Sequence, residues 1–436
     1  MFLSLNRIGC KCSVRAVPEI SENLLQELVS ENKDFYIFTD LGGGWASKMK
    51  TVLGERWLTI DHHQLPQEEI LTDDSNQIFN AWKYGLDGGI DISSGGMAYE
   101  LAIALNSKNR DLSAIAVVSA IADRQDQGDK RSLTGVNAEI LATAESLRIA
   151  SRDLDVMVTG RETRPIHEAL ALTSTPYIHN LTWNSEKCHA MLTAAGLRLK
   201  HDGRWRVFSE LTQEEKGIVL DAVAKYIAVE GSFTANVIDE MIGYVYTIEG
   251  EDKRSQLRDA REFSTMLNAA GRTGNSGVGI SLCTGDRDNA LFEAEKIVQM
   301  YRNSLKSYIN AIVSDESRTV EEQACVFITG EGIIPEKMLG AVSSLLGSSQ
   351  SFSSKLLFVR TLSDDGKSYK FSCRRGSTSR SKINLGLLMR ECATKVCGTG
   401  GGHSGAAGCR VPSDTVPEFL LLISTNAREE QFVSRF

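Results

Sequence analysis

The chain has 436 residues, of which 42% are apolar and 24% charged, and its formal net charge is −8. This length accommodates two or three domains with cores of their own. The negative charge argues against a surface coated with basic residues for indiscriminate DNA binding, and no apolar run reaches the ~20 residues that a membrane helix needs. We expect no signal peptide in residues 1–17, and we interpret the nine scattered cysteines as reduced thiols of a cytoplasmic protein.

Two short apolar segments near the start of the chain each lead into acidic residues. Residues 35–38 precede Asp40, and residues 57–60 precede Asp61-His62-His63. Both segments are typical of strands, and a weaker one, Ile78-Phe79, precedes Asn80. Ligands collect at the carboxyl ends of strands in open α/β sheets. Imidazole and carboxylate together favour manganese or a similar divalent ion.

Helical patterns follow these segments. Ser93-Ser94-Gly95-Gly96 opens a helix, and a second apolar helix runs over residues 112–122 and ends at Asp123. The alternation of strands and helices over about 170 residues predicts a parallel sheet with both faces covered. From about residue 145 to residue 250 the pattern becomes helical and more polar, and it contains Gly-Arg-Glu-Thr-Arg-Pro at residues 160–165.

The second half of the chain predicts a connector and a further α/β unit. Residues 268–272, which end in Arg272, lead into a glycine-rich loop ending near Gly279, and residues 290–312 form one long amphipathic helix. A new α/β unit begins near Ala324. Its predicted strands are residues 325–329, 356–361 and 369–373, and near its end lies Gly-Thr-Gly-Gly-Gly-His-Ser-Gly at residues 398–405.

The candidate ligands support the prediction of a metal site only in combination. A single aspartate after a strand is more often a turn former or a helix cap than a ligand. Here Asp40, Asp61-His62-His63 and Asp123 each follow an apolar segment of one predicted domain. A two-metal site needs such a convergence, because one ion lowers the pKa of a nucleophilic water and both stabilise the phosphate.

The glycine-rich segment before His403 has two interpretations. It is a tight turn beside a helix, or its backbone N–H groups cradle a phosphate to which His403 also donates. Arg374, on or just after a predicted strand, and Arg272, in its glycine-flanked loop, are candidates for phosphate contacts. For both arginines the alternative is ordinary surface solvation.

Taken together, these motifs resemble the DHH phosphoesterases and, among them, the RecJ-like single-strand nucleases, most closely their archaeal branch. The resemblance covers nearly the whole chain. Its motifs are residues 35–40, 61–63, 93–96, the helix ending at Asp123, residues 160–165, residues 268–272, and Gly-Gly-Gly-His at residues 400–403, the signature of the DHH-associated domain.

The resemblance implies an α/β fold with four parts. We expect a DHH phosphoesterase domain at residues 1–175, a helical insert at residues 176–255 and a connector with a long helix at residues 256–322. A DHH-associated substrate-binding domain then occupies residues 323–436.

The resemblance also implies roles for individual residues. Two ions of Mn²⁺, or Mg²⁺, are expected in an intact member of the family. Asp40 would bridge the two ions, and His62 and Asp123 would be ligands of one. His63 would contact the scissile phosphate or support the site, and Asp61 would orient a histidine. The substrate contacts would come from Arg272 in the connector and from Arg374, Gly401, Gly402 and His403 in the associated domain.

One part of the family pattern is missing. The family's first motif is a strand followed by a His-x-Asp-x-Asp-Gly type segment, which supplies further ligands, chiefly to the other metal. Residues 1–40 contain no histidine, and the acidic residues before Asp40 do not form that pattern; they are Glu19, Glu22, Glu27, Glu31 and Asp34. Either the start lies upstream or one metal's ligands have been lost. We favour the upstream start, because the other site residues are present.

Three hypotheses for function follow. The first is a metal-dependent exonuclease that hydrolyses single-stranded DNA or RNA, with replication or repair proteins as partners. The second is a non-catalytic DHH scaffold, like relatives that are structural members of the replicative helicase. The third is a nanoRNase-type enzyme acting on short oligonucleotides, although such proteins usually lack the helical insert. DNA or RNA preference, polarity, partners and oligomeric state do not follow from the sequence.

Overall fold

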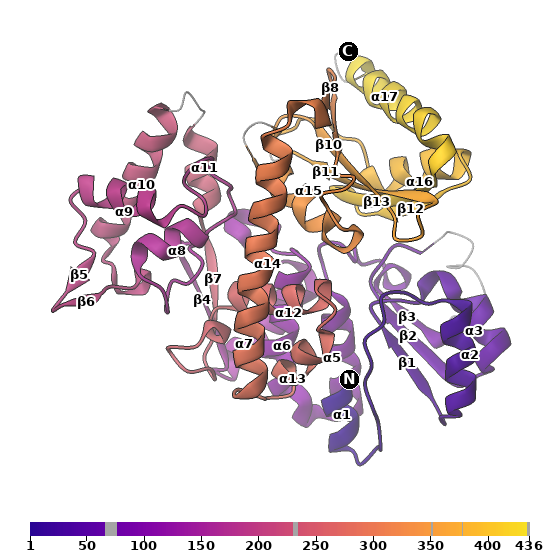
Figure 1. Ribbon diagram of the computed structural model, residues 1–436. Coiled ribbons are helices and arrows are strands. Elements are labelled where there is room, and N and C mark those ends of the chain that lie inside the picture. The colour runs from indigo at the N-terminus through magenta and orange to yellow at the C-terminus, as the bar shows by residue number, and fades with distance from the viewer. Residues whose placement is uncertain (66–75, 230–233, 350–351, 377, 434–436) are drawn as a thin grey trace. The chain divides into compact units, whose positions relative to one another are not determined.

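The computed structural model describes residues 1–65, 76–229, 234–349, 352–376 and 378–433 (Figure 1). The chain forms two compact units, one made of Met1–Met157 and Ile242–Val298 and the other of Val158–Met241 and Gln299–Phe436. The fold is α/β, as the sequence predicts. All nine cysteines are free thiols, and no helix in the described part of the chain is long and apolar enough to cross a membrane. The four domain boundaries proposed above stay a prediction.

The first unit is built around a small parallel sheet. Its strands are β1 (Tyr36–Thr39), β2 (Trp57–Asp61) and β3 (Ile78–Asn80), in the order β1-β2-β3. The helices of this unit are α1 (Phe2–Arg7), α2 (Glu22–Glu31), α3 (Ala46–Leu53), α5 (Ser94–Leu105), α6 (Ser113–Ala122), α7 (Gly135–Ser146), α12 (Ala260–Arg272) and α13 (Ser276–Cys283). The parallel sheet and the two helices predicted over residues 93–122 are therefore confirmed.

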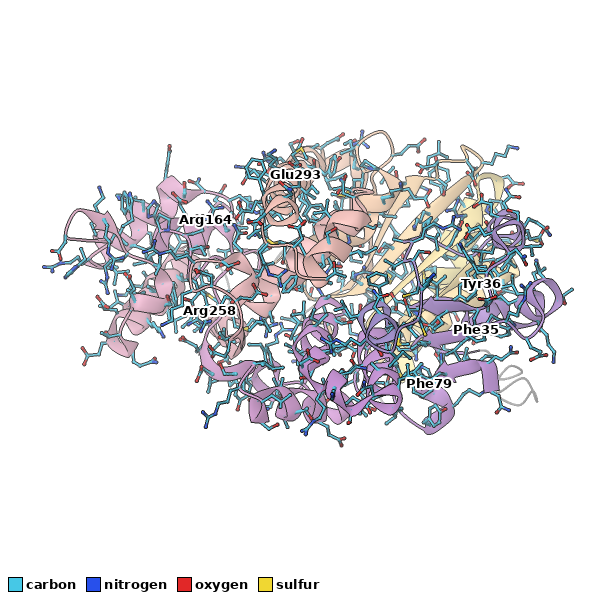
Figure 2. All side chains as sticks on the ribbon, turned by 90° about the horizontal axis from the view of Figure 1, so that it is seen from below. Phe35, Tyr36, Phe79, Arg164, Arg258 and Glu293 are labelled. Atoms are coloured by element: carbon cyan, nitrogen blue, oxygen red, sulfur yellow. The ribbon has the colours of Figure 1, made fainter. Side chains whose placement is uncertain are left out.

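Helices pack on both faces of this sheet, against apolar side chains that alternate between the two faces along each strand. Tyr36 and Trp57 are buried against α2 and α3, whereas Ile60 on β2 is buried with Met97 of α5. Successive strand side chains point to opposite faces, which explains why the short apolar runs are continuous rather than alternating with polar residues. Phe35, just before β1, is exposed, and Tyr36 next to it is buried (Figure 2).

The helical pattern predicted from about residue 145 to residue 250 omits a pair of strands that lie at the two ends of this segment. β4 (Ala150–Val156) and β7 (Ile242–Ile248) form a two-stranded antiparallel sheet, with Ala150 opposite Ile248. β7 is rich in residues that favour strands, but β4 is polar and carries charges. Its partner follows more than eighty residues later, so local periodicity gives little sign of the pairing.

Arg272 does not lie in a glycine-flanked loop, contrary to the prediction. It is the last residue of α12, and the glycines that follow lie in a turn and in α13. Glycine disfavours a helix by about 1 kcal/mol relative to alanine. Packing compensates here, because Leu282 of α13 is fully buried and α13 packs closely on α12.

The second unit contains a mixed sheet and a helical insert. The sheet order is β12-β13-β11-β10-β9-β8, with only β9 and β10 parallel. Its strands are β8 (Thr319–Glu321), β9 (Cys325–Thr329), β10 (Leu356–Leu362), β11 (Ser368–Arg375), β12 (Thr399–Gly402) and β13 (Ala406–Pro412), and its helices are α15 (Leu339–Ser348), α16 (Leu385–Lys395) and α17 (Val416–Val433). The three strands predicted in this region are confirmed.

The insert observed in the second unit is the segment Val158–Met241, which is connected along the chain to residues of the first unit at both of its ends. It contains α8 (Ile166–Leu172), α9 (Ser185–Ala194), β5 (Lys200–His201), β6 (Arg204–Trp205), α10 (Gln213–Val229) and α11 (Thr234–Met241). The long helix α14 (Asn289–Val313) confirms the predicted amphipathic connector, and the boundary between the two units falls within it at residues 298 and 299.

The glycine-rich segment before His403 is not a tight turn but the edge strand β12. It pairs with β13, with Gly401 opposite Gly408. A side chain at Gly400 would place its Cβ 2.6 Å from the Met389 carbonyl of α16, and one at Gly402 would lie 2.6 Å from the Ala407 Cα. The glycines therefore let β12 pack closely against α16 while it pairs with β13.

The core of the second sheet predicts a position-dependent stability effect on α17. Ile423 is fully buried, whereas Leu421, two residues away, is 67% exposed. We expect Ile423→Ala to lower the free energy of unfolding by about 2–5 kcal/mol because it leaves a cavity, and Leu421→Ala to change it by less than about 0.5 kcal/mol. Urea unfolding of the two variants measures the difference; equal losses would contradict this packing.

Candidate functional site

Asp40 and Asp61 lie at the carboxyl ends of neighbouring strands because β1 and β2 pair in parallel. Thr39 lies opposite Ile60, and the Asp40 backbone N–H donates to the Ile60 carbonyl at 2.9 Å. Asp40 has a φ of 67°, in the left-handed region that few residues other than glycine, asparagine and aspartate adopt readily. The chain thus leaves the sheet at Asp40, whose side chain is 55% exposed.

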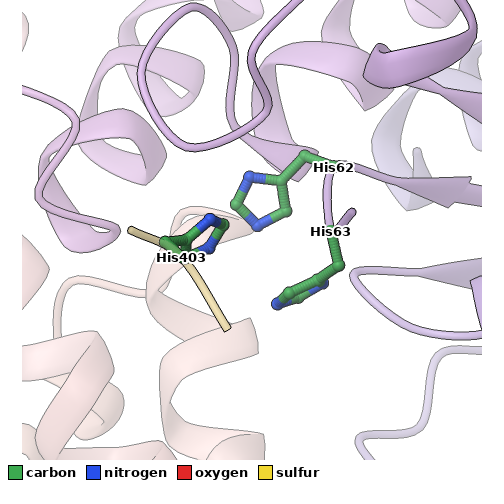
Figure 3. Close-up of side chains that lie close together, drawn as sticks. All are labelled: His62, His63 and His403. Atoms are coloured by element: carbon green, nitrogen blue, oxygen red, sulfur yellow. The ribbon is translucent and has the colours of Figure 1, made fainter. Parts of the chain in front are cut away.

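Asp61 is buried and holds His63. Its Oδ1 accepts from the backbone N–H of His62 at 2.8 Å and lies 2.7 Å from Nδ1 of His63. Its Oδ2 accepts from the Gly43 backbone N–H at 3.4 Å. Burial opposes protonation of His63, but the hydrogen bond to Asp61 and its charge outweigh burial and raise the pKa of His63. Figure 3 shows the rings of His62 and His63 side by side, with centroids 4.6 Å apart.

His62 is buried and directs one ring nitrogen at two carboxylates. Its Nδ1 lies 2.6 Å from the Gly88 carbonyl, which can only accept, so Nδ1 carries a hydrogen. Its Nε2 lies 3.3 Å from Oδ1 of Asp40 and 3.9 Å from Oδ2 of Asp123. Burial opposes the charged imidazole, but the bond to Asp40 and the two carboxylate charges prevail and raise the pKa of His62 to about 9.

Asp123 comes to this point from the end of α6. It follows the last helical residue, Ala122, and its backbone N–H donates to the Ser119 carbonyl at 3.0 Å. Burial raises the pKa of Asp123 to about 6; the positive charge of His62 lowers it, and the charge of Asp40 raises it. The site therefore concentrates carboxylates whose charges are compensated by imidazole protons, an arrangement in which a cation can replace those protons.

Gln125 is a residue of this site that the sequence did not single out. Its buried amide Nε2 donates to the Gly88 carbonyl at 2.8 Å and lies 3.1 Å from Nδ1 of His62. Its Oε1 accepts from Nδ2 of Asn137 at 2.6 Å. The amide thus holds the carbonyl that orients the His62 ring. In the sequence it is one of several polar residues after a helix, and only its burial beneath residues 88–92 distinguishes it.

The donor set fits a divalent cation. Ligand atoms of Asp40, Asp61 and His63 lie within 4.8 Å of one another. Nε2 of His62 lies near carboxylate oxygens of both Asp40 and Asp123. Imidazole nitrogen and carboxylate oxygen together suit manganese, and the Gly88 carbonyl, by holding Nδ1, leaves Nε2 as the nitrogen through which His62 would bind a cation. The predicted occupancy by two ions stays a prediction.

Within the second unit, Arg374, Gly401, Gly402 and His403 come from one end of the sheet. Arg374 lies opposite Ala406, and Gly402 lies opposite Ala407. The Arg374 guanidinium already donates to Oγ of Ser344 at 2.8 Å and to the Gly340 carbonyl at 3.1 Å. These bonds attach it to α15, so a bidentate phosphate contact would require their exchange.

The open edge of β12 presents backbone donors. The backbone N–H of His403 donates to the Ala406 carbonyl at 2.8 Å. Along an antiparallel strand, residues that are hydrogen-bonded to the partner strand alternate with residues that are not. Gly400 and Gly402 therefore turn their N–H groups away from β13. The His403 carbonyl accepts from the Gly386 N–H at the start of α16 at 3.1 Å, so this helix end is occupied by the hairpin. Figure 3 also draws the His403 ring, which belongs to the second unit.

The segment before α16 is strongly basic. Residues 366–390 contain seven lysines and arginines and no acidic residue, in a chain whose net charge is −8. Lys382 is exposed and lies just before Ile383, whose carbonyl accepts from Arg375 at 2.6 Å. Residues 385 and 386 then donate to the carbonyls of residues 404 and 403. This basic segment, which the sequence analysis did not single out, therefore lies beside His403.

Two parts of the chain match known domain families. Residues 158–242 match the DHH-CID domain, and residues 322–429 match the DHHA1 domain. An uncharacterized protein of Methanocaldococcus jannaschii is 26% identical over 413 residues, which cover 93% of this chain and 84% of the relative.

Solved structures show the same fold. CDC45 from Entamoeba histolytica has a TM-score of 0.59 at 12% identity, and the match covers 98% of this chain and 91% of that chain. RecJ from Thermus thermophilus in complex with Mn²⁺ has a TM-score of 0.53 at 15% identity, and the match covers 98% of this chain and 49% of that chain. The two domain matches and these structures support the DHH family with a C-terminal DHHA1 domain.

The contacts of Gln125 predict a role in metal affinity. Gln125→Leu cannot hold the Gly88 carbonyl, so the His62 ring loses part of its orientation. We expect the dissociation constant for Mn²⁺ to rise about 10- to 100-fold, as for other residues that orient a ligand. Isothermal titration of the purified protein with Mn²⁺ measures this change.

The control is Gln127→Leu, because Gln127 lies in the same loop but is exposed. It should bind Mn²⁺ like the wild type. Identical affinities for the two variants would show that Gln125 does not position the ligand.

Proposed function

We propose that this protein is a divalent-metal-dependent phosphodiesterase that hydrolyses single-stranded DNA or RNA as an exonuclease. The observation that carries the proposal is the position of His62, whose Nε2 faces both Asp40 and Asp123 while its Nδ1 is held by Gly88. This arrangement suits metal ligation, because one imidazole nitrogen and two carboxylates face one another there.

His62, Asp40 and Asp123 would hold the metal. A bound Mn²⁺ or Mg²⁺ would supply a nucleophilic water of lowered pKa and would stabilise negative charge on the phosphate. The buried Asp61 keeps the His63 imidazole in place and favours its protonated form. A protonated His63 can donate to a phosphate oxygen, which would stabilise the charge that develops during hydrolysis.

The second unit would bind the substrate backbone. The outward N–H groups of Gly400 and Gly402 and the imidazole of His403 are donors of the kind that bind phosphate. Lys382 and its basic segment add positive charge beside them. A strand of nucleic acid offers one phosphate per nucleotide, which such a row of donors can follow.

The matches to the DHH-CID and DHHA1 domains support this proposal at the level of reaction class, because DHH proteins are usually phosphoesterases. The RecJ structure in complex with Mn²⁺ supports the choice of metal. The proposal includes a role beside replication or repair proteins, and the fold likeness to CDC45 and RecJ is what supports it.

A catalytically impaired scaffold is the second candidate. The small number of candidate metal ligands favours it, since a site for two ions needs several of them. Among the described residues of the first unit, the candidate ligands near β1 and β2 are Asp40, Asp61, His62, His63 and Asp123. The fold likeness to CDC45 extends over 91% of that chain, which is compatible with such a role.

Asp40 provides the decisive test of catalysis. With Mn²⁺ and a 5′-labelled single strand, we expect the wild type to release mononucleotides. Asp40→Asn should lower the rate at least about 100-fold, which corresponds to about 2.7 kcal/mol of transition-state stabilisation, because a metal ligand loses its charge. Product lengths on a denaturing gel measure the rate.

Asp34→Asn is the matched control, because Asp34 is exposed and lies six residues before Asp40 in the turn that leads into β1. It should cleave at the wild-type rate. A wild-type protein that binds Mn²⁺ but leaves the strand intact with Mn²⁺ and with Mg²⁺ would exclude the nuclease and favour the scaffold.

The basic segment predicts a binding defect without a chemical one. Lys382→Ser should raise KM for a single strand with little change in kcat, and should make the salt dependence of binding shallower by about 0.7 in slope, the value for one phosphate contact. Lys395→Ser, at the other end of α16, is the control and should change neither quantity. Equal effects of the two substitutions would reject a specific contact.

A further inference from the structure

The helical insert carries a basic hairpin that the proposed catalytic site does not use. β5 and β6 pair with Lys200 opposite Trp205 and His201 opposite Arg204. Asp202 and Gly203 form the turn, with φ values of 49° and 80° typical of a two-residue hairpin loop. Figure 1 shows the hairpin extending from the insert below α8 and α9. Residues 198–206 contain four arginines and lysines and one acidic residue, a local charge of +3 in a chain of −8.

A groove of about 540 Å³ lies beside the hairpin. It is lined by Arg198, His201, Arg204, Arg206, Glu210, Thr212 and Glu215. This volume is within the range of small-molecule sites, so a phosphate and its sugar can enter. The lining is polar and contains three guanidinium groups, which match phosphate oxygens in geometry and charge.

The acidic residues of the groove neutralise only part of this charge. Glu215 contacts both terminal nitrogens of Arg206, at 2.6 and 2.7 Å, and this partly buried pair shapes the groove. Glu210 contacts Arg204 at 2.7 Å, but the Arg204 side chain is 63% exposed. An exposed ion pair contributes at most about 1 kcal/mol, so a phosphate can compete for Arg204. Arg198 is exposed at the rim.

Trp205 adds an aromatic surface next to these cations. Its side chain is partly exposed, and its ring contacts His167 and His189, with centroids 4.7 and 5.8 Å away. Lys200 lies 4.2 Å from the ring centroid. An exposed indole beside a basic groove is the combination with which proteins bind single strands, because bases stack while phosphates meet cations. An acidic peptide would bind to the cations but would have no use for the exposed indole, so the combination favours nucleic acid.

We propose that the β5–β6 hairpin and its groove bind single-stranded nucleic acid, with phosphates in the groove and a base against Trp205. This contact lies on the insert and is separate from the metal ligands of the first unit and from β12. It would lengthen the stretch of strand that the protein holds. It does not depend on catalysis, because binding can be measured with all divalent metal removed.

The test is fluorescence anisotropy of a labelled oligothymidylate of about 20 nucleotides, longer than a typical binding module covers, in EDTA. Arg198→Ser combined with Lys200→Ser should weaken binding at least tenfold and reduce the salt slope by about 1.4, as expected for two phosphate contacts. Trp205→Leu should weaken binding without changing the slope. Thermal unfolding of each variant verifies that the insert is folded.

The matched control is Lys187→Ser combined with Lys225→Ser, which removes the same charge from exposed positions of α9 and α10 in the same insert. It should stay within twofold of the wild type. Equal losses in both double variants would overturn the proposal, because the effect would then reflect net charge. Binding of polyglutamate is measured in the same way. The proposal would also be overturned if Trp205→Leu did not change the affinity for DNA and the Arg198→Ser, Lys200→Ser variant lost affinity for polyglutamate as strongly as for DNA. The surface would then be a docking face for acidic proteins. None of these results depends on whether the protein cleaves DNA.

Discussion

The parallel pairing of β1 with β2 is the constraint on which the candidate metal site depends. The register that sets Thr39 opposite Ile60 brings Asp40 and Asp61 to the same edge of the sheet. A shift of one residue would move Leu58 and Ile60 together from the face that packs on α5 to the face that packs on α2 and α3, and would move Trp57 the other way. The apolar residues on both faces of these strands therefore define the site indirectly, because they permit only one register.

The second requirement is the orientation of one ring. His62 would be a poor ligand if its imidazole could rotate, since either nitrogen would then face the carboxylates. The Gly88 carbonyl removes this freedom, and a Cβ at Gly88 would lie 1.8 Å from the His62 carbonyl oxygen. The backbone can approach His62 this closely only because residue 88 is glycine. Gln125 holds the carbonyl from the other side, so the loop, the ring and the end of α6 form one hydrogen-bonded unit.

The sequence predicted those parts whose signal is local. β1, β2 and α5 combine apolar runs with a following aspartate or a Ser-Gly-Gly start, and α14 has a long helical period, so all four were predicted. β4 was missed because its stability comes from the distant strand β7. β12 was missed because a run of glycines predicts a turn, and only the nearby α16 makes side chains impossible there. Gln125 was missed because burial, and not residue type, gives it a role.

The cluster of Asp40, His62 and Asp123 has physical properties that favour metal binding. A scaffold has no use for Asp123 beside Asp40, since burial raises the pKa of Asp123 to about 6 and makes its ionised form unfavourable. Replacing a buried charged group with an apolar residue is often neutral or stabilising, so the buried Asp61 and His62 carry a cost when no cation is bound. A metal ion reverses this balance, because it makes ionised Asp123 and the unprotonated Nε2 of His62 favourable together. The cluster as a whole, with Gln125 buried behind His62, therefore favours a protein that binds metal.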